Sequence, residues 1–248
     1  MGFFDKLFGQ TKPSVPPATA AAPPAAAGSD LLTRYAGMAL DKQSQLQDVY
    51  GDIQRWDVDL DAGKIYLDGH EGIAVQAIGS FAYGDSSWLW AWGNQASDLP
   101  EAVLADVARI RQYGQQHGIG WLNERSFPST FERLHEIGAA AVGLCGADAY
   151  YLGDYGQGVL LMNLYDDKLK QAHTNSPHLR TLSMIPQLVS VFELPDHRAA
   201  VRHYLQDKGY RLTETDRQLS AERADGGLVA EFDAQGRLSG LNSRMQPS

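Results

Sequence analysis

The stretch from Trp88 to Trp92 alternates indoles with aliphatic side chains, and it constrains the fold more than any other segment. In a strand, successive side chains point to opposite faces, so Trp88, Trp90 and Trp92 share one face. Leu89 and Ala91 make the other face apolar as well. This pattern predicts a central strand covered on both sides, with the indoles in the core. A groove in which the indoles stack on a sugar or a cation is the functional alternative.

Helices and strands in mixed order surround this segment, which predicts an α+β fold with an antiparallel sheet and packed helices. Ser29 and Ser129 are the expected helix caps, and glycines mark the expected helix ends. The expected elements are a helix at 29–51, strands at 55–61, 65–67, 72–82 and 87–92, helices at 97–116 and 129–145, and strands at 150–152 and 159–165.

The last part of the chain, residues 191–248, is predicted to be a small β-α-β-β-β module that packs on the rest. Val191 to Leu194 is the expected first strand, and Pro195-Asp196 starts the expected helix, which ends at Gly209. Short strands are predicted at 210–215, 218–223 and 228–232, with a further extended segment at 237–241.

Residues 1–29 differ in composition from the rest of the chain. Phe3, Phe4, Leu7 and Phe8 have the spacing of one helix face, and the charged pair Asp5-Lys6 between them argues against a signal peptide. The Pro- and Ala-rich segment 11–29 predicts a disordered tether. We therefore expect three parts, at 1–29, 30–190 and 191–248, with the Phe-rich tip either a frayed end or a docking element.

The chain is acidic, with 30 Asp and Glu residues against 21 Lys and Arg, a formal charge of -9. Residues 30–190 carry 20 acidic and 11 basic residues, and eight of the acids lie between Asp41 and Glu71. Such a surface repels phosphate backbones and favours a basic protein partner over nucleic acid. The expected partner-binding residues are Asp48, Asp52, Asp57, Asp59 and Asp61, with an ordinary solvated surface as the alternative.

No metal or other cofactor is predicted. The alternation Asp57-x-Asp59-x-Asp61 is similar to a calcium loop, but its turn glycine comes one place late and position twelve is Asp68 instead of Glu. The seven histidines show no zinc-binding spacing. No glycine-rich segment joins a strand to a helix as a phosphate-binding loop does.

Two segments contain nucleophiles. Ser86 follows Gly84-Asp85 in an expected hairpin turn, where turn chemistry accounts for these residues. Cys145 lies at the apolar end of an expected helix, and His135 or His117 would have to act as its base. We expect a buried structural thiol and no enzymatic activity. A single cysteine and the lack of a long apolar stretch favour a cytoplasmic location.

Several short motifs accompany the tryptophan segment: Trp56-Asp57-x-Asp59, Ile78-Gly79-Ser80, Trp88-x-Trp90-x-Trp92-Gly93-Asn94 and Arg111-x-Tyr113-Gly114. With them, residues 30–165 resemble a family of uncharacterised bacterial domains that has a Trp-x-Trp-x-Trp-Gly-Asn signature. The resemblance implies no established chemistry for any residue.

In its overall character, an acidic protein of two parts without a catalytic constellation, the chain is similar to immunity proteins of type VI or contact-dependent toxins. We therefore expect a cytoplasmic binding protein that covers the basic groove of a toxin, plausibly a nuclease, with its acidic face. A module that binds a small ligand or carbohydrate through Trp88, Trp90 and Trp92 is the alternative, and a hydrolase centred on Ser86 or Cys145 is a third interpretation.

Overall fold

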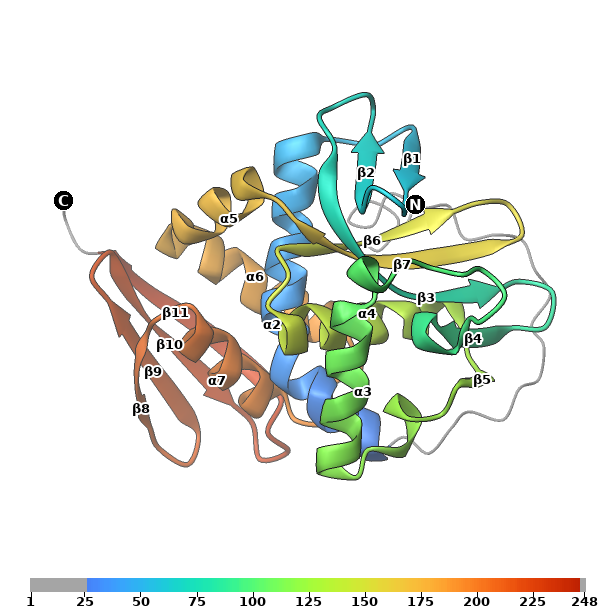
Figure 1. Cartoon of the computed structure of the whole chain (residues 1–248). Coiled ribbons are helices and arrows are strands. Elements are labelled where there is room, and N and C mark those ends of the chain that lie inside the picture. The colour runs from blue at the N-terminus through green and yellow to red at the C-terminus, as the bar shows by residue number, and fades with distance from the viewer. Residues whose placement is uncertain (1–25, 246–248) are drawn as a thin grey trace.

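The computed structural model describes residues 26–245, and its mixed helices and antiparallel sheets confirm the predicted α+β class (Figure 1). A larger sheet with its helices is followed by a four-stranded sheet near the C-terminus. The expectations for the Phe-rich tip and for most of the tether fall on residues 1–25, which lie outside the described residues.

The first described helix, α2 (Ala26–Tyr50), ends at Gly51, whose φ of 71° agrees with the expected glycine stop. Its start differs from the prediction. The helix begins three residues before Ser29, so Ser29 is not its N-cap and residues 26–29 are not part of a tether. Alanine is the best helix former, and the helix accordingly extends into the alanine-rich segment.

The larger sheet is antiparallel throughout, and β3 (Ile73–Ala82) is its central strand. One edge of β3 pairs with β7 (Gly158–Tyr165), which in turn pairs with β6 (Ala149–Asp154). The other edge pairs first with β2 (Lys64–Leu67) and then with β4 (Ser87–Trp90). The outermost strands are β1 (Trp56–Asp59), next to β2, and the short β5 (Ser126–Pro128), next to β4, which the sequence pattern did not predict.

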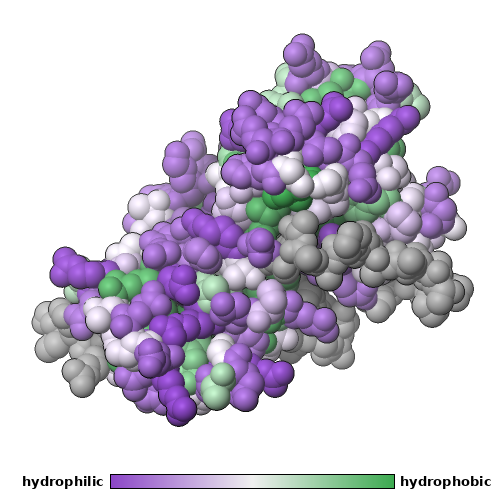
Figure 2. Space-filling view, turned by 90° about the horizontal axis from the view of Figure 1, so that it is seen from below, coloured by the Kyte–Doolittle hydropathy of each residue, from purple (hydrophilic) through white to green (hydrophobic). Residues whose placement is uncertain are grey.

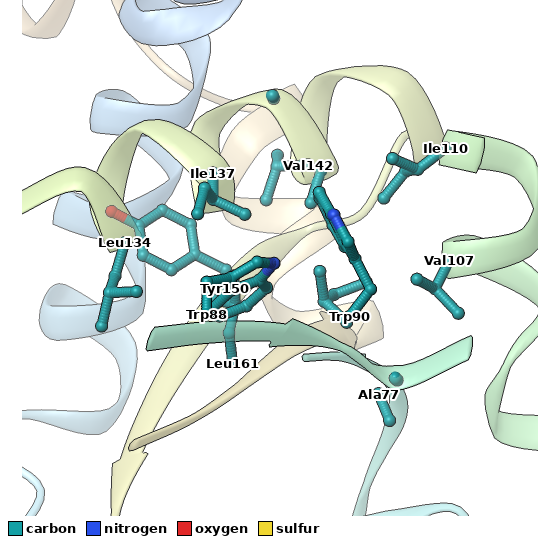
Figure 3. Packing of buried hydrophobic residues seen from close by; sticks show 14 of the residues in the cluster. Ala77, Trp88, Trp90, Val107, Ile110, Leu134, Ile137, Val142, Tyr150 and Leu161 are labelled. Carbon is teal, nitrogen blue, oxygen red and sulfur yellow. The ribbon is translucent and has the colours of Figure 1, made fainter. Parts of the chain in front are cut away.

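The tryptophan strand is shorter than predicted. It ends at Trp90, and a single 3₁₀ turn, Ala91–Gly93, follows, so Trp92 does not share a strand face with the other two indoles. Trp88 and Trp90 are 0% and 1% exposed, and their ring centres lie 5.4 Å apart in edge-to-face contact. They form the core between the sheet and helices α3 (Ala105–His117) and α4 (Phe131–Cys145) (Figure 3).

Two further helix starts were wrong in detail. The expected helix at 97–116 begins only at Ala105, after the 3₁₀ turn Glu101–Val103, although it ends at Gly118 as expected. The N-cap of α4 is Thr130, whose hydroxyl accepts a hydrogen bond from the amide of Arg133, and not Ser129.

The C-terminal part begins with helices that the sequence pattern did not predict, α5 (Asp167–Thr174) and α6 (His178–Val191). The expected strand Val191–Leu194 is wrong, because Val191 ends α6 and the following residues form a connection whose Phe192 and Leu194 are buried. A short apolar run does not by itself distinguish a strand from the buried end of a helix.

The remaining elements lie close to their predicted positions. They are α7 (His197–Asp207), β8 (Arg211–Glu214), β9 (Gln218–Arg223), β10 (Gly226–Phe232) and β11 (Leu238–Met245). These strands form a sheet in the order β11-β10-β9-β8, so the module is α-β-β-β-β instead of β-α-β-β-β.

Helix α2 lies between the two sheets and contributes to the core on each side (Figure 1). Leu31 belongs to the core of Trp88 and Trp90. One side of the helix packs instead against α6, α7 and the smaller sheet, through Leu32, Ala36, Ala39 and Leu40. The side chains of α6 and the smaller sheet therefore share one core with α2.

An ion network centred on Asp41 lies in this contact. Asp41 is fully buried, and its carboxylate lies 3.0 Å from Lys208 Nζ and 2.5 Å from Arg180 Nε. The hydroxyl of Tyr204 donates to the same carboxylate at 3.0 Å. Burial raises the pKa of Asp41, but the charges and hydrogen bonds of Lys208 and Arg180 outweigh this and hold the pKa below its ordinary value.

Replacing Asp41 by Asn leaves the buried ammonium of Lys208, whose side chain is 3% exposed, without its counter-charge. We expect D41N to lower the free energy of unfolding by about 3–5 kcal/mol, measured by urea denaturation. The matched control is D207N, which breaks the more exposed pair with Arg34 and should cost at most about 1 kcal/mol. Equal losses in the two variants would contradict this assignment.

Candidate functional site: the acidic hairpin

The hairpin of β1 and β2 stands at one end of the larger sheet (Figure 1). Along β1, Trp56 and Val58 are half-buried and Asp57 and Asp59 are exposed, as the alternation predicted. Trp56 anchors the hairpin, because its ring lies 6.0 Å from that of Tyr151 and its Nε1 donates to the carbonyl of Asp154. Among the described strands, β1 pairs only with β2, so no described strand pairs with its outer edge.

The hairpin aspartates also hold the local backbone. Asp59 Oδ1 accepts from the amide of Ala62 at 2.8 Å and closes the turn. Asp57 Oδ1 accepts from the amide of Val58 at 3.0 Å. Asp61 is exposed in the turn itself. We call Asp57, Asp59 and Asp61 the acidic hairpin.

The other acids of this region differ in their surroundings. Asp48, although more than half exposed, lies 2.5 Å from Arg180, so its charge is already paired. Asp52 is exposed and accepts from the side-chain amide of Gln47 at 3.2 Å. Asp41 is inside the protein. The five residues expected to form one face therefore fall into two groups. Asp48 is paired with Arg180, whereas Asp52 and the acidic hairpin form no ion pair with any described residue.

The expected ligand face of three tryptophans is not an open surface. Trp88 and Trp90 are covered by α4 and α3, and both point into the core (Figure 3). Trp92 is half-buried, and the guanidinium of Arg111 lies 4.0 Å from its ring centre. A sugar or cation therefore has no access to Trp88 or Trp90 in this structure.

The candidate nucleophiles are not brought together with a base. Ser86 lies in the β3–β4 turn with a φ of 53°, away from any strand-to-helix junction. The thiol of Cys145 is buried and points to the carbonyl oxygen of Asp106. His135 Nδ1 lies 2.9 Å from the hydroxyl of Tyr150, and His117 stacks on Tyr113.

The sequence reasoning missed a buried polar cluster between α3 and β7. Asp106 is 4% exposed, and its Oδ2 accepts from Asn163 Nδ2 at 2.7 Å and from the Tyr165 hydroxyl at 2.6 Å. The backbone amide of Asp106 donates a hydrogen bond to Gln76 Oε1 at 3.3 Å. An acid in the first turn of a helix is common, so no local signal marks Asp106 as buried. Because Asp106 has these donors, the cluster fixes α3 on the sheet.

On the face seen in Figure 2, polar residues predominate and hydrophobic residues show in small areas between them. Within residues 26–245, no group of three or more His, Cys, Asp or Glu side chains is arranged to hold a metal ion. None of the described helices is long and apolar enough to cross a membrane.

Burial raises the pKa of the Cys145 thiol above its usual range, which keeps the thiol protonated and unreactive. We expect iodoacetamide to label Cys145 on the order of 100-fold more slowly in the folded chain than in urea, measured by mass spectrometry. Equal labelling rates in both states would instead identify a reactive cysteine.

Burial lowers the pKa of His135 to about 3, against an ordinary value of 6.5. Below pH 6.5 the unfolded chain therefore binds a proton at His135 that the folded chain does not bind. The free energy of unfolding decreases as the pH is lowered from 6.5 towards 3. Between pH 7.5 and 5.0, we expect the wild-type chain to lose about 2 kcal/mol more than H135Q in urea denaturation. The exposed control variant H117Q should lose as much as the wild type.

The comparison with known proteins identifies a family. A family model described as "Family of unknown function (DUF6882)" matches residues 29–164, from α2 to β7, in agreement with the expected uncharacterised domain family. No curated protein matches the chain, and no solved structure matches it. Because the matched residues make up more than half of the 248, the chain belongs to this family of unknown function.

Proposed function

We propose that this chain is a non-enzymatic, cytoplasmic protein whose acidic hairpin binds a basic protein partner. The observation that supports this most strongly is the placement of Asp57, Asp59 and Asp61, all exposed on an anchored hairpin whose β1 pairs with no described strand other than β2. Like charges crowded on one hairpin repel each other, and a basic partner relieves this repulsion when it binds.

The most concrete form of this proposal is an immunity protein. Carboxylates spaced along a strand present an array of negative charge, as a nucleic acid backbone does, and a nuclease toxin of a type VI or contact-dependent system has a basic groove that accepts such an array. The acidic hairpin would cover this groove and block the active site. Electrostatic attraction would also speed association, which an inhibitor of a toxin requires.

A salt-dependent pull-down tests the class of partner. We expect the tagged full chain to retain a stoichiometric basic protein from the native bacterium at low salt and to release it at about 1 M salt, where screening reduces the range of charge interactions to about 3 Å. Mass spectrometry identifies the partner. A partner that is acidic, or that is retained equally at both salt concentrations, would contradict the proposal.

The hairpin itself is tested by D57K/D59N/D61K. Asn at position 59 keeps an oxygen for the amide of Ala62, so the variant changes the charge without removing the acceptor of the turn. We expect the association rate with the captured partner to fall at least about tenfold, measured by surface plasmon resonance.

The matched control is D167N/D216K/E222K, which changes the net charge equally at exposed acids outside the hairpin. Its association rate should stay within about twofold of wild type. Equal losses in both variants would show that only net charge matters, and unchanged rates in both would exclude the acidic hairpin as the binding surface.

A further inference from the structure

The larger sheet divides beside the acidic hairpin. Strand β3 pairs with β2 at Ile73 and Ala74 and with β4 only from Gly79 onward. A cavity of about 200 Å³ opens at this division. By strand alternation its floor, formed by Ser80, Leu89 and Leu160, faces away from the core of Trp88 and Trp90.

The cavity has apolar walls, a floor of two leucines and one serine, and a polar rim. Leu60, from the turn of the acidic hairpin, and Leu99 form walls together with Tyr155, which is 51% exposed. Asn94 Nδ2 donates to Ser97 Oγ at 2.8 Å, so these two rim side chains are bonded to each other. Pockets that enclose whole ligands or cofactors have volumes of about 300–1,000 Å³, so this cavity fits one large side chain better than a complete small molecule.

Acidic residues are next in sequence to several residues that line the cavity. Asp59 and Asp61 are the sequence neighbours of Leu60, Asp98 precedes Leu99, and Asp154 precedes Tyr155. All four carboxylates are exposed. No Lys, Arg or His is a direct sequence neighbour of any residue that lines the cavity, although the exposed Lys64 lies opposite Asp59 in the strand register of the acidic hairpin. An apolar side chain that enters the cavity would therefore be accompanied most favourably by cations.

We propose that this cavity receives one large apolar side chain, preferably aromatic, from a basic segment of the protein partner. The inference rests on the proposed function and adds the anchor that a charged surface alone lacks. Binding energy at protein interfaces concentrates where an aromatic or similar side chain fills a pocket surrounded by residues that exclude water. The exposed carboxylates next in sequence to the lining residues attract the flanking cations.

The chain's own N-terminal tip is the competing occupant, because it contains Phe3, Phe4 and Phe8. Its ten residues hold one Asp and one Lys. They therefore lack the positive charge that the carboxylates near the cavity favour.

The test uses the full chain labelled with ¹⁵N and the peptides acetyl-KKFKK-amide and acetyl-KKAKK-amide, compared by NMR titration at low salt. We expect the phenylalanine peptide to shift the amide resonances of Ser80, Leu89 and Leu160 and to bind at least about tenfold more tightly than the alanine peptide. S80L, which fills the cavity from its floor, should remove this preference. D57K/D59N/D61K should weaken both peptides.

The outcomes separate the two proposals. If both peptides bind equally and D57K/D59N/D61K weakens both, the cavity is not an anchor site, and the acidic hairpin remains the binding surface. Shifts of the cavity resonances in the full-chain variant F3A/F4A/L7A/F8A without any peptide would assign the cavity to the chain's own tip and overturn the proposal. If S80L does not fold, the two peptides with the wild-type chain still test the proposal. Equal affinity for the phenylalanine and alanine peptides would overturn the proposal.

Discussion

The buried carboxylate of Asp41 is the interaction on which the arrangement of the two halves depends. Helix α2 contributes side chains to both cores, and Asp41 lies on the side that faces α6 and α7. A charge in this position is tolerated only with partners, and both cations that pair with it, Arg180 and Lys208, come from outside the family-matched residues. A packing that buried Asp41 without Arg180 and Lys208 would leave an uncompensated charge, which costs about 3–5 kcal/mol.

Local sequence signals were sufficient where contacts between residues close in sequence determine the structure. The alternation along β1 and the glycine turns of the smaller sheet predicted those strands closely. The predictions failed where contacts between distant residues decide. Strand β4 ends at Trp90 because Arg125 bonds the chain on both sides of the turn, through its carbonyl oxygen to Trp90 and through Nε to Gly93. Helix α6 contains Pro186, which weakens any local helical signal.

The prediction of exposed acids around the candidate site is limited in the same way. Asp41 and Asp48 lie two turns apart on α2 and both contact Arg180, yet only the first is buried. A count of acids along the sequence treats them alike, because the difference is made by Tyr204 and Lys208, more than 160 residues away. The aspartates of β1 also have a second physical effect. Charged side chains on an exposed edge strand discourage pairing with the edge of another sheet, so the same residues protect the hairpin from aggregation.

The family match ends at residue 164, but the folded unit does not. Leu32, Ala36 and Leu40 lie within the matched residues, and the side chains that cover them lie beyond its end. A protein cut at that boundary would keep the larger sheet except for Tyr165, the last residue of β7, and would present an apolar strip with an isolated carboxylate along its first helix. In this chain the strip on α2 therefore needs residues beyond the family match to cover it, so the boundary of the matched sequence is not a boundary of the folded structure.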